Sequence, residues 1–296
     1  MESSRAEGIL VTMSLQFAVL ASGSQGNATL VETGGGALLL DCGLGPRVLA
    51  HRLESVGSCW DRVRSALLTH THGDHVDDFT LRRMAKQRVF LYCHEGHRGP
   101  LARFAGFREL DDAGLVRHYD DRPFLTPSGQ QVEAIELRHD GPTFGFRVEA
   151  RTGRKGRTVA LGYMADTGCW SDGMADAFAG VDLLGVEFNH DVALQRASPR
   201  SPALIARNLG DRGHLSNEQG AGFVRAVLRR SRPTDVRHLV LLHLSQQCNR
   251  TQLALRTARD AVKSEGRRVR VHAASQSPAH PNVRVEPSRR RARAAG

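Results

Sequence analysis

The feature that most constrains the fold of this chain is a short segment rich in histidine and aspartate that follows an apolar run. Directly after Leu68, four side chains that can bind a metal fall within six residues: His70, His72, Asp74 and His75. Side chains two residues apart on an extended strand point the same way, so the first two histidines face one side. The glycine after them permits a tight turn that brings the last two side chains toward the same cavity. Imidazole and carboxylate ligands together suit Zn²⁺ best, with Mn²⁺ and Fe²⁺ as alternatives.

Length and charge set broad limits on fold and partners. The 296 residues are 40% hydrophobic, which is enough for a sizeable core in one large domain or two small ones. The formal net charge is +10, and four of those charges lie in the last ten residues, so the rest of the chain is also basic. A basic surface favours polyanions such as nucleic acid. The alternative is a generally arginine-rich composition that has no bearing on nucleic acid.

Cysteine use and hydropathy favour a cytoplasmic location. The five cysteines are scattered, odd in number and form no Cys-x-x-Cys pair. This pattern argues against a disulfide framework and for a reducing compartment. No apolar run reaches transmembrane length, and residues 1–12 lack the apolar core of a signal peptide. We therefore expect a cytoplasmic protein with no membrane partner, and a homodimer is left open.

Hydrophobic patterns predict strands alternating with helices in one domain, 14–273. It follows an N-terminal extension, 1–13, and precedes a basic, disordered tail, 274–296, rich in Pro, Ser and Arg. Strands are predicted at Leu15–Leu20, Leu30–Thr33, Ala37–Leu40, Val63–Leu68, Val89–Cys93, Val132–Leu137, Thr143–Val148, Thr158–Met164, Val181–Val186, Val236–Leu242 and Val269–Val271. Helices are predicted at Pro46–Val56, Asp77–Gln87, Glu218–Arg229 and Thr251–Glu265.

Several polar residues near the strands are ambiguous when taken alone. The turn Ala21–Thr29 is rich in glycine and serine, and it either presents N–H groups to a phosphate or is an ordinary hairpin turn. His94 and His97 have no acidic partner nearby and are interpreted as loop or core histidines. His139 and Asp166 each follow a strand, where a lone His or Asp is more often a loop residue than a ligand.

The His-x-His-x-Asp-His pattern resembles the signature of the metallo-β-lactamase superfamily, and the presence of Asp74 resembles its nuclease and phosphodiesterase branch. The span from Leu15 to His272 is similar to the YycJ/WalJ-like metallo-hydrolases. Further segments carry that resemblance: Ser22–Asn27, His139-Asp140, Asp166–Gly168, Glu187–Asp191, Gly213–Asn217 and His243–Ser245. The chain departs from the family in two places. Cys248-Asn249 stands where the family tends to carry Asn-Asn, and Ala193–Leu209 lacks an aromatic-Pro core, which bears on the substrate contacts of that segment.

The resemblance implies an α/β (α+β) fold, the metallo-β-lactamase αββα sandwich of two mixed sheets with helices on the outer faces. It also implies two divalent metal ions, Zn²⁺ first, bridged by Asp166. One site would consist of His70, His72 and His139, and the other of Asp74, His75 and His243. Asp41 would hold the metal-binding loop through hydrogen bonds without being a ligand.

Resemblance to ribonuclease Z-like enzymes implies a catalytic pair, in which Glu187 orients His214 as a proton donor. Asp74 belongs with that pair in the catalytic set. The expected function is a metal-dependent phosphodiesterase that uses an activated hydroxide, specifically a DNA exonuclease, with DNA preferred over RNA. One alternative is a hydrolase of small phosphodiesters, thioesters or lactones. A non-catalytic binding protein on the same fold is the other.

Overall fold

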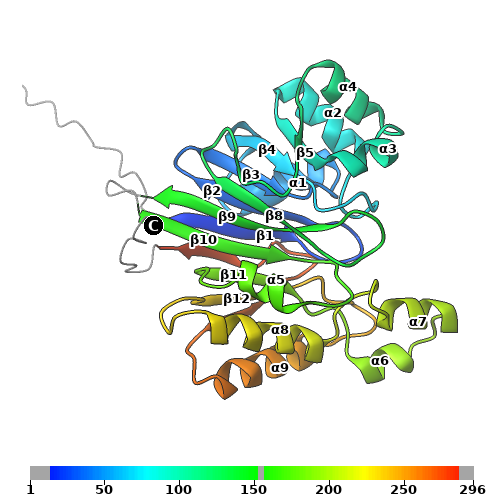
Figure 1. Ribbon diagram of the computed structural model, residues 1–296. Coiled ribbons are helices and arrows are strands. Elements are labelled where there is room, and N and C mark those ends of the chain that lie inside the picture. The colour runs from blue at the N-terminus through cyan, green and yellow to red at the C-terminus, as the bar shows by residue number, and fades with distance from the viewer. Residues whose placement is uncertain (1–13, 153–156, 287–296) are drawn as a thin grey trace, which may run out of the picture.

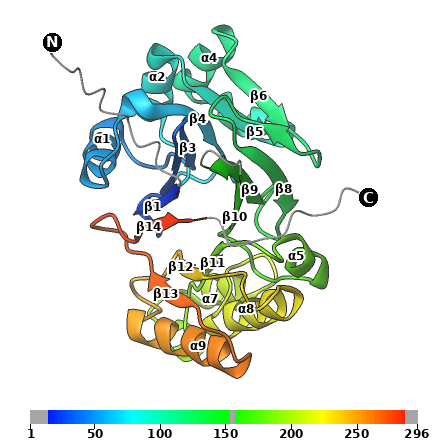
Figure 2. The same ribbon diagram turned by 90° about the vertical axis from the view of Figure 1, so that its left-hand side faces the viewer.

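Two seven-stranded sheets lie face to face at the centre of the protein, and helices cover their outer faces (Figure 1). The computed structural model describes residues 14–152 and 157–286. A view turned by 90° shows the layers in cross-section, with the early helices over one sheet and the late helices over the other (Figure 2). This arrangement is the αββα sandwich that the sequence predicts.

The first sheet is antiparallel in one half and parallel in the other. Its strand order is β14 (Asn282–Val285), β1 (Leu15–Ala21), β2 (Ala28–Thr33), β3 (Gly36–Leu40), β4 (Val63–Leu67), β5 (Phe90–His94) and β6 (Val116–Tyr119). The first four strands pair antiparallel, and β3 to β6 pair parallel. Parallel neighbours need crossover connections, and helices supply several of them.

The second sheet has the same division, with an antiparallel half followed along the chain by a parallel half. Its strand order is β13 (Arg270–Ala273), β12 (His238–Leu242), β11 (Leu183–Glu187), β10 (Arg157–Met164), β9 (Phe144–Thr152), β8 (Gln131–Glu136) and β7 (Phe124–Leu125). Strands β7 to β10 pair antiparallel, and β10 to β13 pair parallel. The parallel strands share one direction, so their carboxyl ends lie along a single edge of the sheet.

The helices fall into two sets, one for each sheet. The first set comprises α1 (Pro46–Ser55), η1 (Trp60–Arg62), α2 (Asp78–Gln87), η2 (Glu95–His97), α3 (Arg98–Leu101) and α4 (Ala105–Asp112). The second set comprises α5 (Asp172–Ala177), α6 (Val192–Arg196), α7 (Pro202–Leu209), α8 (Asn217–Arg230) and α9 (Thr251–Ser264). The longest of these helices have 14 residues. In the part of the chain that the structure describes, no helix combines the length and the apolar character needed to cross a membrane.

Alternation along the strands builds the core. In β1, Phe17 and Val19 point between the two sheets, whereas Ala18 and Leu20 point toward the helices over the first sheet. Strand β10 behaves in the same way on the second sheet, because successive side chains of a strand point to opposite faces. Both faces of each sheet are therefore covered by apolar contacts, which fixes the strand ends relative to one another.

The structure differs from the sequence prediction at the tail. Strand β14 lies within 274–296, which the sequence predicts to be disordered, and it pairs antiparallel with β1. Val283 and Val285 alternate with polar residues and are buried opposite Phe17 and Leu15. Two apolar residues suffice here because a preformed sheet edge supplies the partner strand, which composition alone does not reveal. The predicted extension 1–13 and the last residues of the tail, 287–296, lie outside the described residues.

Helices α6 and α7 are also absent from the sequence prediction. They occupy the Arg- and Pro-bearing segment between β11 and α8, and they project from the body of the protein (Figure 1). Ser201 caps α7 by accepting a hydrogen bond from the N–H of Leu204, and Pro202 begins its first turn. Both helices are too short to show a clear apolar period in the sequence.

Candidate metal centre

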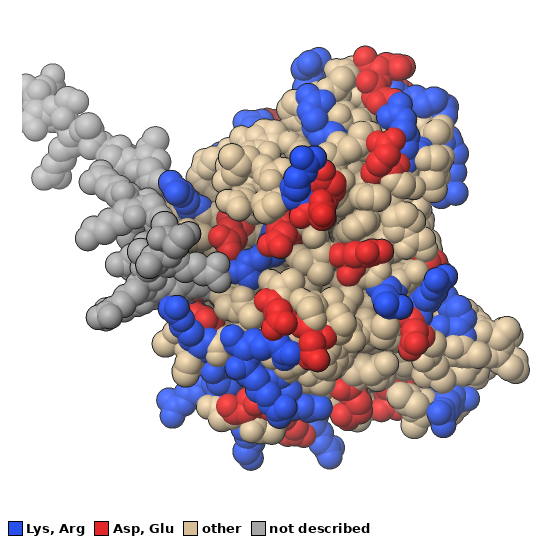
Figure 3. Space-filling view, in the orientation of Figure 1, with Lys and Arg blue, Asp and Glu red and all other residues tan. Residues whose placement is uncertain are grey.

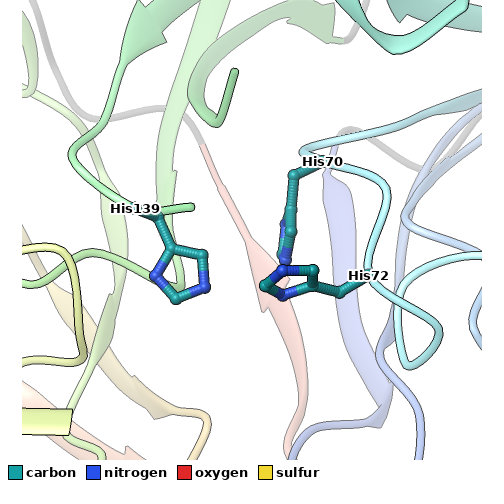
Figure 4. Close-up of side chains that lie close together, drawn as sticks. All are labelled: His70, His72 and His139. Atoms are coloured by element: carbon teal, nitrogen blue, oxygen red, sulfur yellow. The ribbon is translucent and has the colours of Figure 1, made fainter. Parts of the chain in front are cut away.

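Three histidines from two loops face one another at the edge of the sandwich (Figure 4). His70 and His72 follow β4, and His139 follows β8. Their ring centroids are 4.5 Å apart for His70 and His72, 5.3 Å for His70 and His139, and 5.1 Å for His72 and His139. One ring nitrogen of each lies within 4.8 Å of the others, so a single ion can contact all three.

The hydrogen bonds of these histidines leave one nitrogen free on each of two rings. His139 donates from Nδ1 to the carbonyl oxygen of Gly213 at 2.8 Å, and Nδ1 of His70 lies 3.0 Å from Oγ1 of Thr69. The Nε2 atoms of His70 and His139 are buried without a hydrogen-bond partner among the described residues. Burial lowers the pKa of both imidazoles, which favours the neutral form. A neutral imidazole bonded through Nδ1 presents the Nε2 lone pair to a metal.

A second group lies beside the first. Oδ2 of Asp74 is 3.5 Å from Nε2 of His75 and 3.6 Å from Nε2 of His243. Burial by itself would lower the pKa of each imidazole, but the carboxylates of Asp41 and Asp166 outweigh it and raise the pKa of His75 to about 10. The pKa of His243 is also raised, chiefly by Asp166 against the effect of burial. The carboxylates that favour these imidazole protons would also attract a divalent cation, and the bound cation would displace the protons.

Asp166 lies between the two groups. Its Oδ2 is 2.8 Å from Nε2 of His75, and its Oδ1 is 2.8 Å from Nδ1 of His243. It also belongs to a set of close donor atoms with His70. Burial raises the pKa of Asp166, but the neighbouring imidazoles of His243 and His75 outweigh burial and hold it well below its usual range. Asp166 is therefore an anion in contact with both groups, as a bridging carboxylate must be.

Asp41 contacts the ligand candidates from behind and belongs to none of the close donor sets. It is fully buried and accepts hydrogen bonds from the backbone N–H of Thr69 at 2.8 Å and from Nδ1 of His75 at 2.8 Å. The hydroxyl of Thr69 lies 3.0 Å from the same carboxylate and 3.0 Å from Nδ1 of His70. These contacts orient His70 and His75 with their Nε2 atoms away from Asp41.

The glycine-rich turn after β1 holds the loop that carries Asp74. Asn27 donates from its backbone N–H to the carbonyl oxygen of Asp74 at 2.7 Å and from Nδ2 to the Asp74 carboxylate at 3.1 Å. The N–H groups of Gly23 and Gly26 also bond within the protein. A Cβ at Gly43 would lie 1.9 Å from the carbonyl oxygen of Asp74, so only glycine permits this approach. Of the two interpretations of this turn, the structure favours an ordinary turn, whose N–H groups bond within the protein, over a phosphate-binding turn.

Three residues of the site have a left-handed backbone that is unusual for residues other than glycine. The φ angles are 62° at Asp41, 54° at Asp166 and 55° at His243. Each lies just after a strand, and the side chain of each contacts a ligand candidate of the cluster. Such conformations cost about 1–3 kcal/mol each and persist where surrounding contacts over-determine them, most often at functional sites.

Glu187 and His214 form a buried pair next to the second group. Oε1 of Glu187 is 2.8 Å from Nδ1 of His214, and Oε2 accepts the backbone N–H groups of Thr167 and Leu215 at 3.0 Å each. Burial raises the pKa of Glu187, but His214 outweighs it and holds the pKa at about 2. In turn, Glu187 overcomes the effect of burial and raises the pKa of His214 to about 9. The pair therefore carries a proton on the imidazole at neutral pH.

Arg207 is a residue of this site that the sequence prediction does not contain. It lies on α7, and its Nη1 is 3.3 Å from Nε2 of His214. It also forms an ion pair with Asp140, the residue that follows His139. The only signal in the sequence is the arginine content of the segment before Gly213-His214, which does not single out one arginine.

His94 and His97 lie outside the close donor sets found among the described residues. His97 is buried, its Nδ1 accepts the backbone N–H of His94 at 3.2 Å, and its Nε2 donates to the carbonyl oxygen of Pro142 at 2.9 Å. Burial lowers the pKa of His97 to about 4. It therefore supports the loop that carries His139, in line with its interpretation as a core histidine.

The donor set fits two divalent cations. Only imidazole nitrogens and carboxylate oxygens are offered, a combination that suits Zn²⁺ and accommodates Mn²⁺ or Fe²⁺. The buried Nε2 atoms of His70, His139 and His243 have no hydrogen-bond partner among the described residues. Buried polar atoms are rarely left unsatisfied without a ligand, ion or water. All seven sequence-predicted ligands lie in the cluster: His70, His72, Asp74, His75, His139, Asp166 and His243.

Comparison with known proteins gives matches over most of the chain. A family model described as a beta-lactamase superfamily domain matches residues 37–244. Exodeoxyribonuclease YycJ of Bacillus anthracis is 28% identical over 254 residues, 86% of this chain and 91% of that protein. A ribonuclease Z of Kineococcus radiotolerans is 28% identical over 287 residues, 84% of this chain and 87% of that protein. The metallo-β-lactamase fold protein YhfI of Bacillus subtilis shares the fold, with a TM-score of 0.60, 17% identity and coverage of 91% of this chain and 100% of that one.

Proposed function

This chain belongs to the β-lactamase superfamily and is a metal-dependent hydrolase with the metallo-β-lactamase fold, and from that premise we propose that it is a DNA exonuclease. Exodeoxyribonuclease YycJ and ribonuclease Z, both similar over most of the chain, act on nucleic acid according to their names. Their shared chemistry is hydrolysis of a phosphodiester bond. The proposal for this chain is that its cluster of histidines and aspartates performs the same reaction on DNA.

The observation that carries the proposal is an arginine and a histidine that lie in contact with each other beside the metal cluster. Arg207 Nη1 and His214 Nε2 lie 3.3 Å apart, and His214 carries a proton at neutral pH because its pKa is about 9. The Arg207 guanidinium and the His214 imidazole therefore offer N–H groups side by side to an anion bound at the cluster. A phosphate oxygen accepts from both, and an arginine guanidinium suits phosphate geometry well.

Each part of the site then has a task in phosphodiester hydrolysis. Two divalent cations held by the seven ligand candidates would supply an activated water and Lewis-acid stabilisation of the phosphoryl oxygens. Arg207 binds the phosphate, and Asp140 holds the guanidinium in place. His214 donates its Nε2 proton to the leaving oxygen, while Glu187 fixes the ring through Nδ1. Asp41 and Asn27 keep His75 and Asp74 oriented.

A small phosphodiester is the second candidate substrate, because much of the basic charge lies away from the site. Basic side chains gather over α8 and α9 on one face of the protein (Figure 3). Arg237 precedes β12 and His243 follows it, so the Arg237 end of this sheet is roughly 20 Å from the cluster at about 3.3 Å per residue. Arg268 and Arg270 lie at that same far end. A small ester needs no basic groove, so its turnover would be insensitive to salt.

The test is cleavage of 5′-labelled duplex and single-stranded DNA by the full chain loaded with Zn²⁺ or Mn²⁺. Asp74→Ala removes one ligand candidate, and Asp61→Ala serves as the matched control because Asp61 is exposed and outside the cluster. We expect metal-dependent degradation from an end that Asp74→Ala abolishes and Asp61→Ala retains. Internal cleavage, a preference for RNA, or hydrolysis of only a small phosphodiester would each overturn the exonuclease proposal.

A further inference from the structure

We propose that a cavity next to His139 binds the nucleotide adjoining the scissile phosphodiester, an inference that rests on the proposed function. The cavity has a volume of about 590 Å³, within the range of small-molecule sites. Its lining contains His139 and residues from three segments of the chain: Glu136, Leu137, Arg138, Gly141, Cys169, Trp170, Ser171, Met174 and Arg212.

The cavity shares its walls with the metal cluster. The first wall is the loop after β8, which carries His139 itself. The second wall begins at Cys169, three residues after Asp166. The third is Arg212, two residues before His214, and the intervening Gly213 accepts the Nδ1 hydrogen bond of His139. A strand whose phosphodiester lies at the cluster therefore has this cavity as an immediate neighbour for one of its nucleotides.

The lining combines an aromatic floor with cationic rims. Trp170, Leu137 and Met174 provide the apolar part. Arg138 and Arg212 provide two guanidinium groups, and no carboxylate lies within ion-pair distance of either among the described residues. The lining therefore has two positive charges against one negative charge, that of the Glu136 carboxylate. A flat aromatic ligand that bears a phosphate matches this combination.

The indole of Trp170 is held in place before any ligand binds. Its Nε1 donates to the carbonyl oxygen of Gln219 at 3.0 Å. Its ring packs edge to face against Phe223, with ring centroids 5.7 Å apart, and it lies over Gly222. A ring fixed on one side and partly exposed on the other loses little freedom when a base stacks on it, and stacking tolerates any base. This suits an exonuclease, which must accept every nucleotide in turn.

Tryptophan fluorescence provides a test that does not depend on activity. The chain has only two tryptophans, Trp60 and Trp170. Trp60 is buried in the core between the first sheet and its helices, donates to the carbonyl oxygen of Pro46 and is not part of the cavity lining, whereas Trp170 packs on the core of the second sheet. The full metal-loaded chain is titrated with 5′-deoxyadenosine monophosphate and, separately, with inorganic phosphate. We expect the nucleotide to quench the emission, phosphate alone to leave it unchanged, and Trp170→Phe to abolish the response. Quenching by phosphate alone, or no change with either ligand, would overturn the inference.

Kinetics on DNA test the same site under turnover. Loss of base stacking costs about 5- to 150-fold in affinity, so Trp170→Ala should raise KM by a factor in that range while kcat and metal content stay close to wild type. Trp170→Phe keeps an aromatic ring and should restore most of the affinity. Arg212→Ala should raise KM, whereas Arg268→Ala, at the far end of the sheet, should not. If Trp170→Ala instead lowers kcat as much as it raises KM, and also lowers the melting temperature, Trp170 is a packing residue and not a base-stacking residue.

The two proposals fail separately. A wild-type chain that degrades DNA without nucleotide quenching, and whose KM is insensitive to Trp170→Ala, rejects the cavity and leaves the exonuclease intact. A chain that shows nucleotide quenching at Trp170 but does not cleave DNA rejects the exonuclease and keeps the cavity as a nucleotide site. The failure of one proposal can therefore be distinguished from the failure of the other.

Discussion

Replacing Asp41 by Asn tests how far the metal cluster depends on a residue that does not belong to it. Asn has the same shape and tolerates the left-handed backbone at this position, where φ is 62°. The change therefore removes the charge without requiring the loop to move. In the wild type, the carboxylate accepts from Nδ1 of His75 at 2.8 Å, which leaves Nε2 of His75 directed at Asp74 and Asp166.

The amide at position 41 cannot reproduce both contacts. If its oxygen accepts from the backbone N–H of Thr69, its NH₂ group faces Nδ1 of His75 and forces the proton onto Nε2, where a metal would bind. If the amide is flipped, two N–H groups face each other at Thr69. A hydrogen bond to a charged group is worth about 1.5–3 kcal/mol, so metal affinity should fall by roughly 10- to 150-fold.

The measurement is the dissociation constant of each bound Zn²⁺, determined by competition with a chelator. Asp182→Asn is the matched control, because Asp182 is also a fully buried carboxylate that accepts a backbone N–H, that of Ala160 at 3.0 Å, but it precedes β11 at the far end of the sheet. We expect Asp41→Asn to weaken the binding of one of the two ions and Asp182→Asn to leave the binding of both unchanged. Wild-type affinity in Asp41→Asn, or an equal loss in both variants, would refute the proposed supporting role.

Three further substitutions address catalysis, substrate binding and stability. His214→Ala should lower kcat by about 10²–10⁴-fold with metal content unchanged, as measured by elemental analysis, and loss of metal would instead make His214 a ligand. Arg207→Ala should raise KM for DNA by roughly 10- to 100-fold and Arg207→Lys by less, and an effect confined to kcat would contradict the phosphate contact. Burial holds the pKa of His97 at about 4, below its unfolded value of about 6.5, so its stabilisation is complete above pH 6.5 and is lost as the pH falls toward 4. In His97→Gln the amide still reaches the carbonyl oxygen of Pro142 but cannot be protonated. Between pH 7 and pH 4, its free energy of unfolding, measured with urea, should therefore fall by up to about 3 kcal/mol less than that of the wild type. An equal fall in both proteins would contradict this role of His97.

The local patterns of the chain predict most of the framework. The helix predicted at Glu218–Arg229 is α8, extended by one residue at each end and capped by Ser216. The alternating pattern at Leu15–Leu20 is β1, and Val236–Leu242 contains β12. These predictions hold because side-chain period and capping are set by residues close in sequence. Strand β14 escapes this reasoning, since its order depends on an edge strand 266 residues away along the chain, as the contact of Gln16 with Asn282 illustrates.

The sequence by itself determines the metal-binding segment of this protein. Four donors within six residues, with a glycine among them, converge because their spacing leaves little freedom for any other arrangement. Only the tertiary structure decides the surroundings of that segment. It brings Asp41 behind His75, Arg207 against His214 and Trp170 into the cavity wall. Each of these contacts depends on how strand ends, loops and helices pack against one another, so no spacing in the sequence encodes the distance between the two partners.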